Sequence, residues 1–170
     1  MRPAPVKLVC GFIFRDGKVF SAALKKLTGA FGPVDFQSPP RAFSYTDYYE
    51  DEMGPGLLRV FVSFKRLVSP ARLVAIKTAT NRIESSLSAR GRRRVNLDPG
   101  YVDHAKLVLA TTKDFSHRIY LDKGIFAEVT LSFRGRSFRN LEWTYPDYRT
   151  DEYITIFNHI RSLYAKQTAE

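Results

Sequence analysis

The chain has 170 residues, of which 44% are hydrophobic and 14% aromatic, proportions that exclude a disordered protein. Its single cysteine, Cys10, excludes an intramolecular disulfide and is typical of a cytoplasmic, reducing compartment, where we expect the protein to reside. The formal net charge of +10 favours polyanionic partners, and no apolar run approaches the roughly 20 residues of a membrane-spanning helix, so no membrane partner is expected.

The N-terminal part of the chain predicts a strand, a helix and two short strands. Residues Val6–Phe14 are rich in β-formers and predict the first strand. Asp16 is placed to cap a following helix, which we expect to end at Gly29 or Gly32. The prolines and aromatic residues of positions 31–49 predict a short strand, a loop and a second short strand.

The central part of the chain predicts a long strand and a second helix. In residues 57–68 every second side chain from Leu58 to Phe64 is apolar and shares one face, which is typical of a buried strand. Ser69 followed by Pro70 is typical of a helix N-terminus, and we expect this helix to end at Gly91.

The remaining chain predicts several strands and a last helix. Residues 95–97 predict a strand that we expect to break at positions 98–100, where Asp, Pro and Gly favour a turn. Residues 106–112, 117–121 and 125–133 predict further strands or one long ribbon with turns. Thr150 is placed to cap the final helix.

This order of elements defines a fold class. We predict an α+β protein with a ferredoxin-like βαββαβ antiparallel sheet and helices on one face, since each helix would then bury its apolar stripe once. The predicted ribbon extends the sheet, and the final helix follows it. The length is typical of a single domain over residues 1–170.

Polar residues gather on the predicted strands between positions 93 and 131, which are otherwise apolar. Burying such groups without partners costs several kcal/mol each, so either they satisfy one another or they face a ligand. We predict a polar pocket in the 94–120 region that binds a small anionic ligand, either a nucleotide or a phosphorylated metabolite. The predicted ligand-binding residues are Asn96, Asp98, Tyr101, Lys106, Lys113, Arg118, Tyr120 and Glu128.

Several of these residues have an alternative role. Asp98 would orient a polar group of the ligand, or it would cap the turn through its own backbone. Lys113 and Arg118 would hold the anion, or they would belong to a solvated hairpin with a weak surface ion pair. His117 is the candidate for proton transfer if catalysis occurs, although the sequence does not decide whether the protein is an enzyme.

No metal site is predicted, and the residues point to no particular cofactor. Asp98, Asp103, His104, His117 and Glu128 lack the local spacing that metal ligands show. For Glu128, pairing with Arg118 or Lys106 across the ribbon is the simpler expectation.

Two other function classes stay open. The basic run near position 92, together with Arg149, would contact the backbone of RNA or DNA; its residues are Arg90, Arg92, Arg93 and Arg94. Trp143 and its neighbouring tyrosines would either stack on a base or plug the end of the core. The third class is a non-catalytic interaction protein, which would show a large exposed apolar patch and no formed pocket.

Long segments of the chain resemble the bacterial and archaeal family known as domain of unknown function 4416. They are TDYYEDEMGPGLLRVFVSF at 46–64, RVNLDPGYV at 94–102, LVLATTKDFSHRIYL at 107–121, GIFAEVTL at 124–131 and EWTYPDYR at 142–149. The resemblance runs almost end to end and implies little about function. Some members are named GTP-binding, but this sequence has no G-x-x-x-x-G-K-[ST] phosphate loop.

Overall fold

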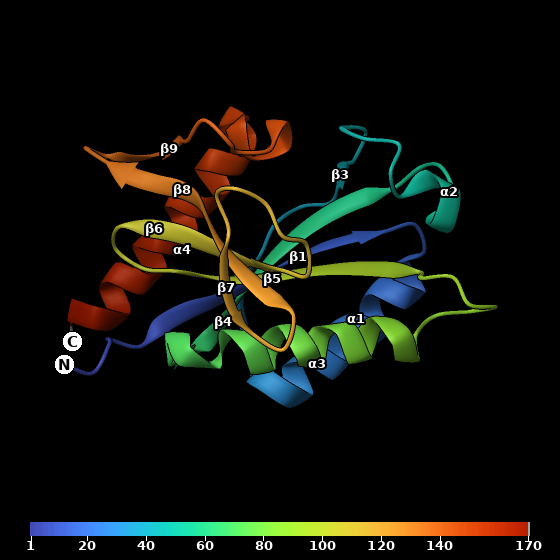
Figure 1. Cartoon of the computed structure of the whole chain (residues 1–170), viewed down its shortest axis with the longest axis horizontal. Helices are drawn as coiled ribbons and strands as arrows, with labels where there is room; N and C mark the ends of the chain where they lie inside the picture. The colour runs from blue at the N-terminus through green and yellow to red at the C-terminus, as the bar shows by residue number, and fades with distance from the viewer. Residues whose placement is uncertain (170) are drawn as a thin grey trace.

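The computed structural model describes residues 1–169, which form one open antiparallel sheet of nine strands and four α-helices (Figure 1). The strands are β1 (Val6–Phe14), β2 (Val34–Gln37), β3 (Arg41–Ala42), β4 (Leu58–Val68), β5 (Val95–Val102), β6 (Lys106–Thr111), β7 (Ile119–Asp122), β8 (Ile125–Arg134) and β9 (Ser137–Asn140). The helices are α1 (Gly17–Phe31), α2 (Glu50–Met53), α3 (Leu73–Ser86) and α4 (Asp151–Ala169), with 3-10 turns η1 (Pro70–Arg72) and η2 (Pro146–Arg149).

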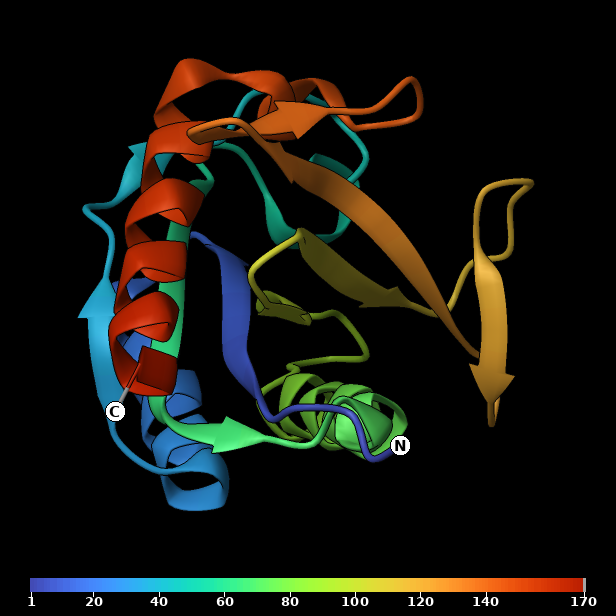
Figure 2. The ribbon, with the colours of Figure 1, turned by 90° about the vertical axis from the view of Figure 1, so that its left-hand side faces the viewer.

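The sheet has the order β2-β4-β1-β5-β6-β8-β7, with β3 paired to β4 and β9 paired to β8. The mixed helix-and-strand class and the antiparallel sheet are confirmed, and the predicted ribbon does extend the sheet. The ferredoxin-like topology is not confirmed, because nine strands are present and their order differs. The ribbon consists of β6, β8 and β7, and β7 is the edge strand on this side of the sheet, where it stands away from the other strands (Figure 2).

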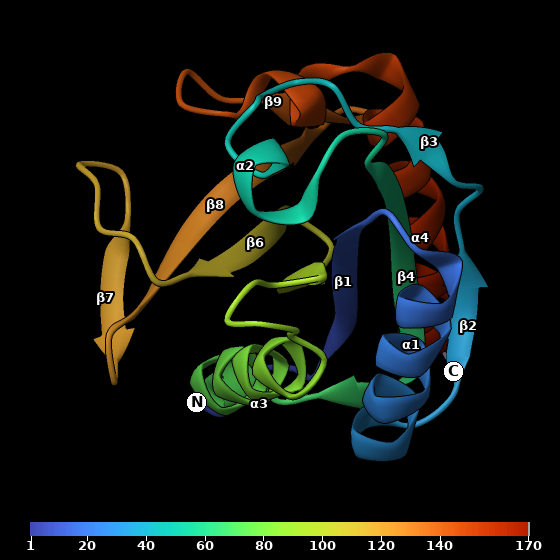
Figure 3. The same ribbon diagram turned by 90° about the vertical axis from the view of Figure 1, so that its right-hand side faces the viewer.

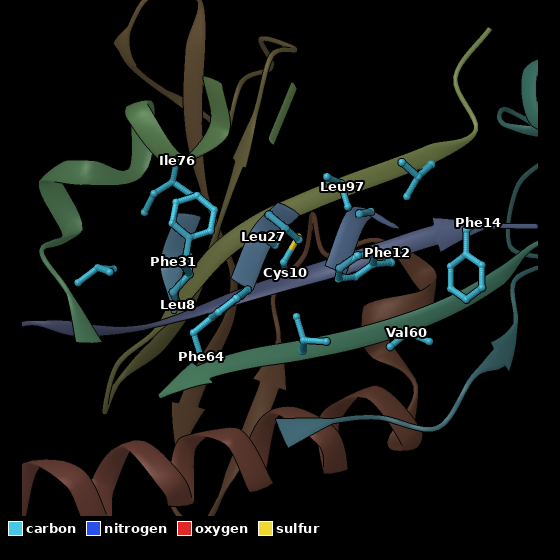
Figure 4. Packing of buried hydrophobic residues seen from close by; sticks show 14 of the residues in the cluster. Leu8, Cys10, Phe12, Phe14, Leu27, Phe31, Val60, Phe64, Ile76 and Leu97 are labelled. Carbon is cyan, nitrogen blue, oxygen red and sulfur yellow. The ribbon is translucent and has the colours of Figure 1, made fainter. Parts of the chain in front are cut away.

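Helices cover both faces of the sheet, so the prediction of helices on one face was wrong. The alternation of β1 explains why. Its even-numbered residues, among them Cys10 and Phe12, pack with Leu27 of α1 and Ile76 of α3 (Figure 4). The odd-numbered Val9 belongs to a second core with α4, which lies behind the sheet when α1 is in front (Figure 3). All nine residues of β1 are buried, as a strand covered on both faces requires.

Strand β5 continues through Pro99, so the predicted break at positions 98–100 was wrong. Pro99 lies opposite Cys10 of β1, but its backbone nitrogen points away from β1. Leu97, two residues earlier, points its N–H and C=O away from β1, where both bond to side chains of α3. Residues two apart in a strand have the same orientation, so the nitrogen of Pro99 points to this outer side too. No strand pairs with that side of β5 until Gly100, so proline removes no bond of the ladder.

Gly100 marks the point where β6 joins β5. A Cβ atom at this position would lie 2.1 Å from the carbonyl oxygen of Val108, so only glycine allows this close approach. The pairing of β5 with β6 covers only Gly100, Tyr101 and Val102. The N-terminal half of β5 therefore has no strand on its outer side. This opening positions the site described below.

Cys10 is 1% exposed, and burial raises the pKa of its thiol well above the ordinary value. Because the thiolate is the reactive form, we expect Cys10 to resist alkylation by iodoacetamide in the folded protein. Mass spectrometry should show one added carbamidomethyl group only after denaturation. Rapid labelling of the native protein would contradict the buried placement of β1.

Candidate ligand-binding site

A cavity of about 760 Å³ lies beside the unpaired half of β5. Its walls come from segments far apart in the chain: β5, α3, the end of β6 with the following turn, and β8. The remaining side is formed by the aromatic stretch 43–49 and by residues 145–148, which include the first three residues of η2. The cavity therefore exists because β6 pairs with β5 at one end only and diverges from it beyond Gly100.

Side chains of α3 bond to the backbone that β5 leaves unpaired. Glu84 Oε1 accepts a hydrogen bond from the Leu97 N–H at 2.6 Å, and Lys77 Nζ donates to the Leu97 carbonyl at 3.1 Å. Buried backbone groups need such partners when no strand provides them. As a consequence, an ammonium and a carboxylate are placed in the cavity wall.

The floor of the cavity is a buried ion cluster around Arg59 of β4. Its guanidinium donates to Asp98 at 2.9 Å and to Asp147 at 3.3 Å, and its side chain is 4% exposed. Asn96 Nδ2 donates to the other oxygen of Asp98 at 3.0 Å. The rings of Phe43, Phe61 and Tyr148 surround the guanidinium within cation–π distance.

The carboxylates of the site have different pKa shifts. Burial raises the pKa of Asp98, but the charges of Arg59 and Lys77 and the hydrogen bonds outweigh this effect, so its pKa lies below the ordinary value. Burial dominates for Asp147 and Glu84, and the pKa of each lies above the ordinary value. Asp98 is therefore the carboxylate that the fold holds in its ionised form.

These shifts predict opposite effects of two amide substitutions at neutral pH. The ionised Asp98 stabilises the fold above its unfolded pKa of about 3.9, and this stability is lost as pH falls through the lower folded pKa. The Asp98→Asn substitution should therefore destabilise the protein at pH 7, and the difference from wild type should shrink at acidic pH.

The pKa of Glu84 is shifted in the direction opposite to that of Asp98. Its pKa is raised, so the fold favours the protonated form, and that contribution is lost as pH rises through the folded pKa. Glu84→Gln keeps the acceptor for the Leu97 N–H and should leave stability at pH 7 unchanged or higher. Urea unfolding of both variants at several pH values checks the pair. Equal losses in both would contradict the assignment of charge.

The mouth of the cavity carries two cations without a carboxylate partner among residues 1–169. Lys113 Nζ lies 4.0 Å from the centre of the Tyr48 ring. Arg118 donates from Nη1 to the Lys113 carbonyl at 3.0 Å, while its Nε is buried and has no hydrogen-bond partner. Neither Lys113 nor Arg118 forms an ion pair within residues 1–169. Within residues 1–169, the mouth therefore carries two positive charges that are not paired directly with a carboxylate.

Glu128 of β8 lines the cavity and contacts His117, with 2.6 Å between Oε1 and Nε2. The expectation that Glu128 pairs with Arg118 or Lys106 was wrong. Neither Glu128 Oε1 nor His117 Nε2 has a further partner in the described residues. The His117 ring stacks on Trp143 at 5.4 Å between centroids, and His117 does not itself line the cavity, whereas its contact Glu128 does.

Five of the predicted ligand-binding residues line the cavity, and three do not. Those in the cavity wall are Asn96, Asp98, Lys113, Arg118 and Glu128. Tyr101 lies on the other face of β5, among the apolar side chains near α3, because it differs from Asp98 by an odd number of residues. Lys106 lies at the far end of β6 and pairs with Asp103 at 2.7 Å. Tyr120 is 58% exposed on β7 and packs on Phe126.

The basic residues of the nucleic-acid hypothesis are mostly bound within the protein. Arg93 forms an ion pair with Glu52 at 2.8 Å and lines the cavity, and Arg94 pairs with Asp16 at 3.2 Å. Arg149 donates to the carbonyl oxygens of Glu142 and Thr144. Arg90 and Arg92 are exposed in the turn after α3, which ends at Ser86 rather than at Gly91.

Sequence reasoning did not identify Arg59, Asp147, Lys77 or Glu84 as site residues. A signal for Arg59 was present, because a charged residue within the apolar run of residues 57–64 must find partners if that strand is buried. The acidic stretch 46–53 contributes the rings of Tyr48 and Tyr49 to the cavity wall, and none of its carboxylates lines the cavity. Its Glu52 forms an ion pair with Arg93.

A family model described as Domain of unknown function (DUF4416) matches residues 4–164. The chain belongs to this family. Searches of curated proteins and of solved structures found no match. In the DUF4416 chain no helix of residues 1–169 is long and apolar enough to cross a membrane, and the same residues hold no group of three or more side chains arranged to bind a metal ion.

Proposed function

We propose that the cavity binds a small metabolite that carries a phosphate group, with the phosphate held by Lys113 and Arg118. The observation that carries this proposal is the pair of cations at the mouth, neither of which has a carboxylate partner within residues 1–169. Arg118 has a buried, unpartnered Nε–H, and such a donor is costly unless a ligand accepts its hydrogen bond. A guanidinium and an ammonium that line the same cavity suit a phosphate, which offers several acceptor oxygens.

The size and lining of the cavity support a small ligand. Its volume of about 760 Å³ falls within the roughly 300–1,000 Å³ of ligand pockets, and it combines tyrosine rings with a few convergent polar groups. A nucleotide or another phosphorylated metabolite fits this space. The formed cavity also speaks against the interaction-protein hypothesis, which expects no pocket.

The polynucleotide alternative has weaker support. Arg93 and Arg149 are engaged by partners within the protein, and Arg94 forms an exposed ion pair with Asp16, so part of the predicted basic surface is already engaged. A net charge of +10 still favours anions in general, and steering of a small phosphorylated ligand uses the same field.

A thermal-shift screen tests the proposal on the wild-type protein. Inorganic phosphate, sugar phosphates and nucleoside monophosphates are compared with chloride at equal ionic strength. A bound ligand should raise the Tm with concentration by mass action. The proposal fails if no phosphorylated compound raises the Tm more than the salt control does.

A further inference from the structure

The inner end of the cavity differs from its mouth, because it presents carboxylates beside its cations. Arg59 is one cation between two carboxylates, Asp98 and Asp147. Lys77 and Glu84 of α3 add one further charge of each sign to the same part of the wall. The side chain of Asp98 is 26% exposed, whereas that of Arg59 is 4% exposed, so the carboxylate rather than the guanidinium is accessible from the cavity. A ligand that reaches this end meets a negatively charged hydrogen-bond acceptor.

The groups at this end have unused hydrogen-bonding capacity. One oxygen of Asp98 accepts a hydrogen bond from Asn96 and the other accepts one from Arg59. Because a carboxylate offers about four acceptor sites, about two remain for a ligand. The hydroxyl of Tyr148 is buried and has no partner in the part of the chain that the structure describes. Asn81 of α3 lines the cavity, and its side-chain amide forms no hydrogen bond within residues 1–169.

This arrangement excludes two kinds of inner group on the ligand. A second anionic group would meet the accessible carboxylate of Asp98 and be repelled, since the Arg59 side chain is only 4% exposed and Lys77 already donates to the Leu97 carbonyl. An aliphatic chain would desolvate these carboxylates without replacing the lost hydrogen bonds to water. Neutral groups that donate several hydrogen bonds, such as the hydroxyls of a sugar, avoid both costs.

Building on the proposed phosphate site, we propose that the ligand is a phosphorylated sugar whose hydroxyls bond to Asp98 and its neighbours while its phosphate lies at Lys113 and Arg118. The sugar is either a free sugar phosphate or the ribose phosphate of a nucleotide. The tyrosine side of the cavity, including Tyr45, Tyr49 and Tyr145, suits both, because aromatic faces pack on sugar C–H groups and on bases.

Isothermal titration calorimetry with four probes tests this inference. The probes are inorganic phosphate, pentyl phosphate, ribose 5-phosphate and adenosine 5′-monophosphate. Pentyl phosphate has the same chain length and head group as the sugar phosphate but no hydroxyls. Wild-type protein should bind ribose 5-phosphate at least about tenfold more tightly than pentyl phosphate, since hydrogen bonds to charged groups contribute this much.

Asp98→Asn should reduce that ratio to about threefold or less while keeping the affinity for pentyl phosphate, because only the sugar reaches the carboxylate. If Asp98→Asn does not fold, Asn81→Ala on the partly exposed face of α3 provides the second variant, with a smaller decrease expected. Lys123→Ala lies outside this cavity and should keep the wild-type ratio.

The outcomes separate the two proposals. If no phosphorylated probe binds, the proposed function fails. If ribose 5-phosphate and pentyl phosphate bind equally well, the phosphate site stands and the sugar inference is overturned. Tighter binding of adenosine 5′-monophosphate than of ribose 5-phosphate identifies the nucleotide as the source of the sugar phosphate, and the reverse order identifies the free sugar phosphate.

Discussion

Replacing Arg59 by leucine is expected to lower the free energy of unfolding by about 3–5 kcal/mol, the cost of removing one partner from a buried ion cluster. Leucine would still pack against Phe43 and Phe61, but Asp98 and Asp147 would lose the cation that both contact. For a chain of this length the Tm should fall by roughly 10 °C. Urea unfolding followed by circular dichroism measures the effect.

The exposed Arg139 on β9 supplies the matched control, because the same Arg→Leu change there should alter stability by less than about 0.5 kcal/mol. Adding Asp98→Asn and Asp147→Asn to the Arg59→Leu variant should restore part of the loss, since no unpaired charge is then buried. A loss at Arg59 as small as that at Arg139 would show that the cluster does not hold the floor of the cavity.

Replacing both Lys113 and Arg118 by alanine should weaken binding of a phosphorylated ligand by about 100-fold or more, because each charged hydrogen bond contributes roughly 1.5–3 kcal/mol. Lys113 is exposed and Arg118 is partly exposed, so the fold should persist with little change in Tm. Calorimetric titration with the most strongly stabilising compound of the screen measures the loss.

The control for this double variant removes the same charges elsewhere. Lys123→Ala with Arg139→Ala changes the net charge equally but leaves the cavity mouth intact. It should lower the affinity only slightly, through the general field of the protein, and added salt should suppress that effect. Equal losses in the two double variants would assign the binding to net charge and would remove the phosphate site.

Local patterns in the sequence predicted most elements of this fold. The first strand is found at Val6–Phe14 as predicted, and the helix that follows is capped by Asp16, whose carboxylate accepts a bond from the Lys18 N–H. Thr150 accepts a bond from the Tyr153 N–H at the start of α4. Capping and alternation involve neighbouring residues, so they can be recognised without knowledge of the tertiary structure.

The site could be predicted only in part because it depends on how distant strands separate. Asn96 and Asp98 share a face by simple alternation, and the same rule places Tyr101 on the other face, a consequence that follows only if the strand continues through Pro99. The divergence of β6 from β5 has no local signature. Without it, the approach of α3 to Leu97 and the burial of Arg59 against Asp98 could not be foreseen.

A crystal structure of the protein soaked with ribose 5-phosphate tests the central claim most directly. We predict phosphate oxygens within about 2.7–3.1 Å of both Lys113 Nζ and the Arg118 guanidinium, and a sugar hydroxyl donating to Asp98. Density for the ligand at the exposed arginines 90 and 92, with the cavity unoccupied, would contradict the claim.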